Sequence, residues 1–207
     1  MKRLAPLVPR HSIRWYGPGE NCADPAPGDM LLVDHGTFVD RSIGVGERIL
    51  AITEPDLKPY VWCRHAALAV EKAPTTEGVY LDSRRGPRMT AGIVSEMGPR
   101  GHEYRAIEDY EHRLYAVVHF EVDDQARAQV TANDAAMHDI EYGWLQYAAF
   151  TVDGFTASRL SLAYGSAMIC STEVTMALMG CGFFPDRPPA LVIPAHLARY
   201  VDARPPA

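Results

Sequence analysis

The sequence predicts a single α+β domain, in which strands from the first part of the chain pack against helices from the second. Short apolar and β-branched runs separated by turn residues occur between residues 30 and 122, and helix-like spacing of apolar residues dominates after residue 123. The chain has 207 residues, of which 47% are hydrophobic and 22% charged, which suits one globular domain with elaborations. Strands with short connections followed by helices are typical of an α+β fold.

The ends of the chain are predicted to lie outside this domain. We expect residues 1–26 to form a polar N-terminal arm, residues 27–200 the domain and residues 201–207 a C-terminal tail. The N-terminal stretch is rich in Pro, Gly and charge, which favours loop. It places basic residues where a signal peptide would need an apolar run, and no apolar run in the chain approaches the roughly 18 residues of a membrane helix. The sequence therefore predicts a cytoplasmic chain without a membrane span.

Five segments are predicted as strands, because apolar, β-branched or aromatic residues fill them between turn signals. They are residues 30–33, 61–70, 78–82, 92–97 and 114–122. The second contains the continuous apolar run at residues 66–70, which is typical of a buried strand. Because the third follows it after a turn-rich gap, we expect these two to pair as a hairpin.

Helices are expected over residues 41–52, 123–150 and 166–179 and from residue 193 onward. Asp123 is a favourable N-cap for the second of these helices, and Gly143 favours a break within it. Gly180 and Gly182 stop the third helix. Pro194 lies in the first turn of the last helix, where proline is well tolerated.

Charge and cysteine content narrow the function classes. The chain has 26 acidic and 20 basic residues, a formal net charge of -6, which argues against nucleic acid as the main partner. Its four cysteines, Cys22, Cys63, Cys170 and Cys181, form no CxxC pair, so we expect reduced thiols. Cys63 and His65 would share one face of a strand, but the other cysteines lack the close spacing of zinc ligands. Neither a metal nor an organic cofactor is expected.

Cys170 is the candidate nucleophile. If its helix is capped at Ser166, the cysteine lies inside the helix; if Ser171 and Thr172 mark the start, Cys170 lies at the N-terminus. Free N–H groups and the positive end of the helix dipole stabilise a thiolate there, and the same N–H groups can hold an oxyanion. The alternative is a small buried hydrophobic residue, since free cysteines are among the most buried residue types.

His65 and Asp82 are the candidate general base and orienting acid. His65 begins the apolar strand, and a strand end holds a base rigidly. Asp82 ends the next predicted strand, and a hairpin would bring its carboxylate to His65, where it would fix the imidazole tautomer. The alternatives are a histidine at a surface strand edge and a solvated acid in a turn. Glu71, after the His65 strand, is the second candidate for the orienting acid.

Four stretches, taken in order, resemble the YiiX-like group of circularly permuted enzymes within the NlpC-type papain-like superfamily. They are residues 27–32 (Pro-Gly-Asp-Met-Leu-Leu), 63–70 (Cys-Arg-His-Ala-Ala-Leu-Ala-Val), 78–83 (Gly-Val-Tyr-Leu-Asp-Ser) and 167–174 (Ala-Met-Ile-Cys-Ser-Thr-Glu-Val). They are similar to the family's opening strand, its catalytic-histidine strand, a strand ending in an acid, and the helix start bearing the nucleophile. Tyr142-Gly143-Trp144 stands where the family has a tyrosine-containing helix.

The sequence also departs from the family pattern. Arg64 replaces a small residue before the histidine, Asp82 replaces the more usual Glu, and Thr172 separates Ser171 from Glu173. None of these departures removes the nucleophile or the base. The replacement of Glu by Asp82 affects the residue expected to orient the His65 imidazole.

The resemblance implies a permuted papain-like fold, an antiparallel sheet or half-barrel packed against helices. It implies a triad of Cys170, His65 and Asp82, with the backbone N–H groups of Cys170 and Ser171 in the oxyanion hole. The activity would be that of a hydrolase or acyltransferase that cleaves an amide, ester or thioester through an acyl-enzyme, without a cofactor. Cell-wall peptides and acyl-lipid conjugates are the implied substrate classes. The rival hypothesis is a non-catalytic binding module that keeps the papain-like shell.

Overall fold

The computed structural model describes residues 5–34, 47–72, 79–82, 86–98, 101–140 and 169–206, with the backbone alone at residues 71–72, 79–82 and 86–89. Within these ranges, six strands form one open antiparallel sheet in the order β1-β8-β2-β3-β6-β7. Their bounds are β1 His11–Tyr16, β2 Met30–Val33, β3 His65–Lys72, β6 Gly92–Gly98, β7 Gly101–Ala106 and β8 Tyr115–Phe120. A separate two-stranded ribbon is formed by β4 (Val79–Asp82) and β5 (Gly86–Met89). The predicted α+β class is confirmed.

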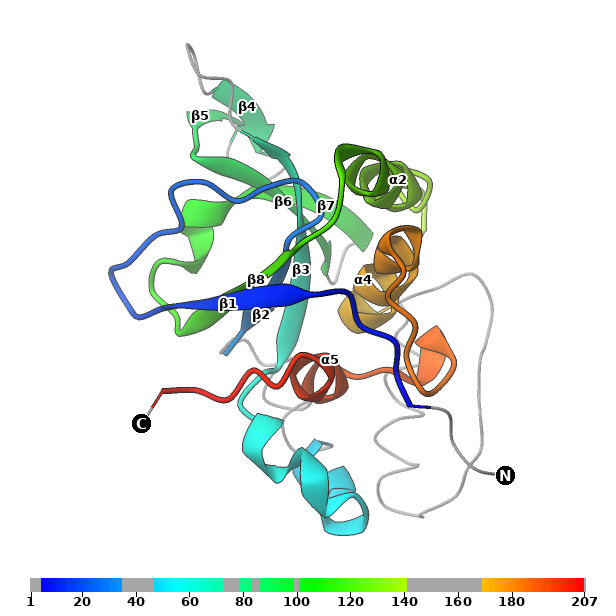
Figure 1. Ribbon diagram of the computed structural model, residues 1–207. Helices are drawn as coiled ribbons and strands as arrows, with labels where there is room; N and C mark the ends of the chain where they lie inside the picture. The colour runs from blue at the N-terminus through cyan, green and yellow to red at the C-terminus, as the bar shows by residue number, and fades with distance from the viewer. Residues whose placement is uncertain are drawn as a thin grey trace.

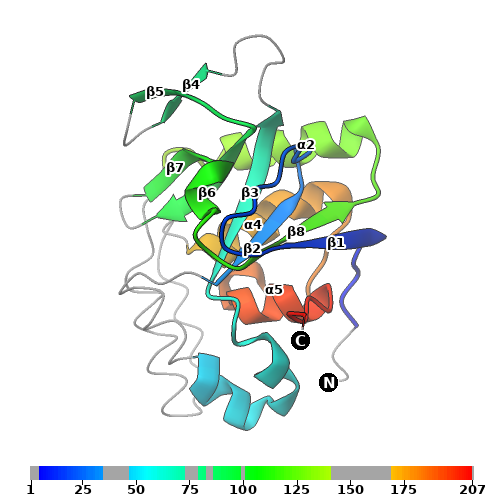
Figure 2. The ribbon, with the colours of Figure 1, turned by 90° about the vertical axis from the view of Figure 1, so that its left-hand side faces the viewer.

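Three α-helices, α2 (Asp124–Ala135), α4 (Cys170–Leu178) and α5 (Pro194–Tyr200), lie on one side of the sheet (Figure 1). Residues 47–53 are also helical. Short 3-10 helices occupy Pro55–Tyr60, Ile107–Tyr110, Met179–Cys181 and Pro189–Leu191. In the view of Figure 2, α4 lies behind the long strand β3, with α2 above it and α5 below.

Alternate residues of the central strands build two cores. Leu32, Ala66 and Leu68 face the helices and pack with the apolar side of α4. Their neighbours Ala67 and Ala69 face the other side, which is covered by tyrosines and by the 3-10 helix Ile107–Tyr110. Because both faces of β3 are covered, its sequence is continuously apolar instead of alternating.

Strand β3 lies in the middle of the sheet, paired with β2 on one side and with β6 on the other. The expected hairpin between residues 61–70 and 78–82 is therefore wrong. With both edges of β3 occupied, β4 has no free partner there, and it pairs with β5, so that Asp82 is in register with Gly86. The strand that actually neighbours β3 downstream is β6, whose existence over residues 92–97 was expected.

The expected N-terminal arm is also wrong over residues 11–16. These residues form β1, an edge strand that pairs with β8 along its whole length, from His11 opposite Phe120 to Tyr16 opposite Tyr115. Edge strands carry charged and polar residues because one of their edges is free, and that composition resembles a loop. The C-terminal tail packs too, since Val201 and Ala203 are buried and the Trp62 indole donates to the Ala203 carbonyl at 3.1 Å.

The helices largely follow their local signals. The Asp123 carboxylate caps α2 by accepting from the Ala126 N–H at 2.8 Å, as expected. The helix ends at Ala135 and residues 136–140 are turn or irregular, so the expected helix over 123–150 is wrong there. Gly143 and the Tyr142-Gly143-Trp144 motif lie in residues 141–168, outside the described residues. Pro194 occupies the first turn of α5. Gly182 has a φ of 85°, in the left-handed region that favours glycine, and ends the last turn after α4.

A buried histidine in α5 predicts a specific acid sensitivity. Burial lowers the pKa of His196 from 6.5 to about 4, with Arg187 acting in the same direction and the Glu54 carboxylate opposing it. The unfolded chain therefore binds the proton more readily, so the free energy of unfolding should fall as pH drops from 6.5 to 4. That difference in pKa corresponds to about 3 kcal/mol.

We expect His196→Gln to remove this fall, as measured by urea denaturation between pH 7 and pH 4. His112→Gln, which changes a largely exposed imidazole, should leave the pH dependence as it is in the wild type. Parallel pH curves for wild type and His196→Gln would contradict the assignment.

Candidate active site

Cys170 is the first residue of α4. Ile169 occupies the N-cap with extended backbone and supplies no side-chain hydrogen bond. The N–H groups of Thr172 and Glu173 bond to the Ile169 carbonyl at 3.0 and 3.1 Å, whereas those of Cys170 and Ser171 have no acceptor within the helix. Neither expected cap, Ser166 or Ser171-Thr172, is the one found, because Ile169 is the cap. The placement of Cys170 at the helix N-terminus, which went with the later of the two starts, is confirmed. The positive end of α4 therefore lies at the thiol.

The side chain of Ser171 has a structural role. Its buried hydroxyl donates to the Val192 carbonyl at 2.6 Å, and the Thr175 hydroxyl donates to the Ser171 carbonyl at 2.6 Å. The first bond ties the first turn of α4 to the segment that leads into α5, and the second lies within the helix. What Ser171 offers to the candidate site is its backbone N–H.

His65, the first residue of β3, lies beside this helix end. Its Nε2 is 2.7 Å from Glu96 Oε2, and the Cys170 side chain lies close enough to the ring to contribute to the rise in its pKa. The structure thus brings together two of the three residues expected to act, from elements 105 positions apart in the chain.

Glu96, on β6, is the acid that contacts His65. One of its oxygens accepts from His65 and from the Tyr110 hydroxyl at 2.5 Å, and the other accepts from Arg105 Nη1 at 2.7 Å. Burial alone would raise the pKa of Glu96, but His65, Arg105 and Tyr110 outweigh it and hold the pKa well below its usual range. The carboxylate is therefore ionised, which is the state that orients an imidazole and supports its positive charge.

The charge state of His65 follows from the same contacts. Burial alone would lower the pKa of the imidazole. The negative charges of Cys170 and Glu96, with the hydrogen bonds to both, outweigh that effect and raise the pKa of His65 well above its usual value. This environment favours the imidazolium form of His65 beside the candidate nucleophile.

The assignment of Asp82 as the orienting acid is wrong. Asp82 ends β4, which belongs to the two-stranded ribbon and not to the sheet that carries His65. Glu71 does not take its place, because it lies six positions beyond His65 on the same strand, roughly 20 Å along it. The sequence does contain a signal for Glu96: it is a charged residue inside an apolar predicted strand, and buried charges require partners.

Two further buried groups surround the thiol. Glu47 accepts from the Ala195 N–H at 3.0 Å, and burial raises its pKa well above the usual value, with the charge of Cys170 adding to the effect. Burial likewise raises the pKa of Cys63, whose Sγ donates to the His65 carbonyl at 3.5 Å. Cys63 is thus held as a neutral thiol next to the site.

No protein-family model matches the chain, and neither a curated protein nor a solved structure is significantly similar to it. Among the described helices, none has both the length and the apolar character needed to cross a membrane. What the chain can do is therefore inferred from its own geometry.

Proposed function

We propose that the protein is a cysteine-dependent hydrolase or acyltransferase that acts on an amide, ester or thioester bond. The observation that carries this proposal is the proximity of Cys170, at the start of α4, to the His65 imidazole, which is hydrogen-bonded to the buried Glu96 carboxylate. Nucleophile, base and orienting acid in hydrogen-bond reach of one another are the signature of an activated nucleophile.

In the proposed reaction, His65 accepts the thiol proton and the Cys170 sulfur attacks the carbonyl carbon of the substrate. The N–H groups of Cys170 and Ser171, which lie in the first turn of α4 and have no acceptor within that helix, donate to the oxyanion. His65 then protonates the leaving group as the carbon–heteroatom bond breaks, which leaves an acyl-enzyme. A water molecule or another acceptor, deprotonated by His65, attacks the thioester and restores the thiol. Glu96 remains ionised throughout and holds the imidazole.

The order of these residues along the chain supports a permuted papain-like fold for this α+β domain. Histidine and acid precede the cysteine, and the antiparallel sheet packs against the helix that carries Cys170. If Glu96 is the orienting acid, the chain no longer differs from the family at this role, because the family that the sequence resembles more often has Glu there. Peptides such as cell-wall cross-links and acyl-lipid conjugates are the substrate classes that this resemblance suggests.

One observation favours the rival, a non-catalytic module that keeps the papain-like shell. Cys170 is 2% exposed and His65 is 7% exposed, as residues of a packed core would be. In that case the thiol would be a small hydrophobic residue with no enhanced reactivity.

Thiol alkylation separates the two functions. At pH 6 to 7, we expect Cys170 to react with iodoacetamide on the order of 100-fold faster than Cys22, Cys63 or Cys181, because an ordinary cysteine is only about 1% ionised there. Burial also raises the pKa values of Cys63 and Cys181. Site-resolved mass spectrometry gives the four rates, and Cys170→Ser provides the blank. Equal rates for all four thiols in the folded protein would favour the non-catalytic module.

A further inference from the structure

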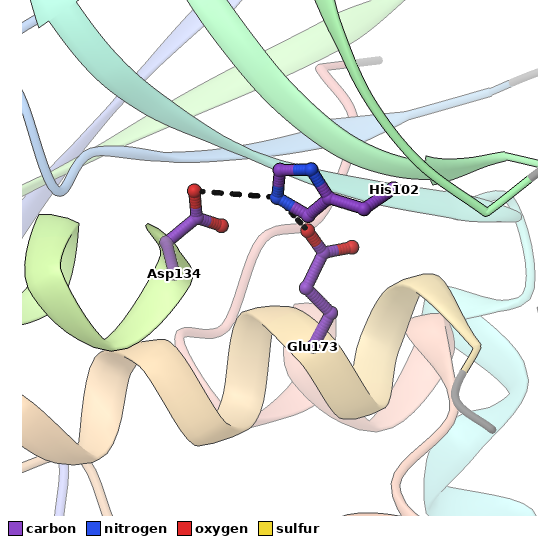
Figure 3. A group of neighbouring side chains, drawn as sticks. All are labelled: His102, Asp134 and Glu173. Carbon is purple, nitrogen blue, oxygen red and sulfur yellow. Dashed lines mark ion pairs between the residues drawn. The ribbon is translucent and has the colours of Figure 1, made fainter. Parts of the chain in front are cut away.

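A second group of buried titratable side chains lies on the same helix as Cys170. Glu173 of α4 meets His102 of β7 and Asp134 of α2 (Figure 3). His102 Nε2 is 3.4 Å from Glu173 Oε1 and 3.5 Å from Asp134 Oδ2, and one ligand atom from each residue lies within 4.8 Å of the others. The three side chains are at most 1% exposed. They contribute three potential metal ligands from three different elements.

The polar atoms of this cluster are not satisfied by the described part of the chain. Both carboxylate oxygens of Asp134, Glu173 Oε2 and His102 Nδ1 are buried without a hydrogen-bond partner there. Leaving such groups unpaired in the interior is costly, most of all for carboxylates. Two acids face one imidazole, so even a protonated His102 would leave a net negative charge. Taken by themselves, these three side chains therefore lack a compensating positive charge.

Ser95 supplies hydrogen bonds to two members of this cluster. Its hydroxyl donates to Glu173 Oε1 at 3.1 Å, and its oxygen is 2.8 Å from His102 Nε2. A hydroxyl carries one proton and no net charge, so it cannot compensate two carboxylates. Its oxygen can instead serve as a fourth donor beside the three ligand atoms.

The dimensions fit a first-row divalent cation. Ligand bonds of about 2.0 to 2.1 Å at tetrahedral angles place neighbouring ligand atoms about 3.3 to 3.4 Å apart. The two measured separations from His102 Nε2, 3.4 and 3.5 Å, are close to that value. One imidazole with two carboxylates suits zinc or manganese, and a double positive charge would neutralise both acids.

We infer that His102, Asp134 and Glu173 form a structural site for a divalent cation such as zinc, which ties α2 and α4 to the edge strand β7. A cation there would hold α4 in place whether or not Cys170 is catalytic. The alternative occupant of the site is a proton, with a neutral Glu173 sharing it with Asp134.

Metal content and thermal stability distinguish the cation from the proton. The full chain carrying Cys170→Ala, so that the reactive thiol cannot act as a ligand, is purified without chelator and analysed by elemental mass spectrometry. We expect about one equivalent of zinc or manganese. After removal of the metal with a chelator, zinc added to 100 times its dissociation constant should raise the melting temperature by about 5 to 10 °C.

Two variants locate the ion. The double variant Asp134→Asn/Glu173→Gln keeps the size of both side chains and should lose the metal and the zinc-dependent rise in melting temperature. Asp29→Asn is the matched control, because Asp29 is also a fully buried acid paired with a histidine, His119, but lies outside the cluster. It should keep the metal.

Three outcomes would overturn the site. One is a Cys170→Ala protein that neither contains metal nor gains stability with zinc, which would leave the shared proton as the occupant. A second is a double variant that retains the metal, which would place the ion elsewhere. The third is loss of the metal in Asp29→Asn as well. Because the first measurement uses the intact cluster, it decides the matter even if the double variant does not fold.

Discussion

Replacing Glu96 by glutamine is expected to lower the rate of Cys170 acylation by about 10² to 10⁴-fold with little change in substrate binding. The amide keeps the size of the carboxylate but loses its charge, and it can present an N–H to His65 Nε2, which favours the wrong imidazole tautomer. The imidazolium that forms when the thiol ionises would then have no counter-charge in a buried site. An interaction needed mainly in the transition state affects kcat more than KM.

The measurement is the burst of p-nitrophenolate released from p-nitrophenyl acetate, which reports formation of the acyl-enzyme. Asp82→Asn is the control, since β4 belongs to a different sheet from His65, and it should acylate at the wild-type rate. Circular dichroism checks that both variants are folded. If Asp82→Asn is slow and Glu96→Gln is not, the assignment of the acid is reversed, and full activity in both would mean that His65 acts without an acidic partner.

Removing His65 should change how the reactivity of Cys170 depends on pH. In the wild type, the raised pKa of His65 keeps the imidazolium through neutral pH, so Cys170 retains a positive neighbour until the pH rises through that pKa. In His65→Gln no cation takes its place, so a thiolate at Cys170 loses the stabilisation that a positive neighbour gives. We therefore expect alkylation at pH 6.5 to be about 100-fold slower than in the wild type and to rise steeply above pH 8.

The pH–rate profile of iodoacetamide alkylation between pH 5 and 9.5 checks this expectation. His119→Gln is the matched control, because His119 also pairs with a buried carboxylate, Asp29 Oδ2 at 2.6 Å, away from Cys170. Its profile should match that of the wild type. A His65→Gln protein that keeps the wild-type profile would show that the helix terminus alone activates the thiol.

Short-range patterns were sufficient for much of the fold. The strands at Met30–Val33, Gly92–Gly98 and Tyr115–Phe120 were expected, because runs of apolar and β-branched residues between turn residues leave few alternatives. The cap at Asp123 and the proline at the start of α5 were likewise visible, since a helix end depends on neighbouring residues. The edge strand His11–Tyr16 was not predicted, because it is stabilised by pairing with β8 and its own composition resembles a loop.

Strand pairing is where prediction from sequence failed, and it misplaced the acid. Backbone ladders are chemically alike whichever strands form them, so the pairing partner is decided by which arrangement buries both faces of β3. That arrangement places β6 beside β3 and brings Glu96 to His65 across 31 residues of sequence. The apolar surroundings of Glu96 marked it as a buried charge in need of a partner, but they did not identify the partner.

Composition and local pattern are sufficient to predict the α+β class and to point to residue types able to act as nucleophile and base. Those features depend on composition and on contacts within a few residues. Only the tertiary structure decided that His65 pairs with Glu96 instead of Asp82, and that His102, Asp134 and Glu173 meet in the interior. In both cases, side chains from separate elements are brought together by strand pairing and by the packing of α2 and α4 against the sheet. Local sequence patterns do not determine the distances between such elements.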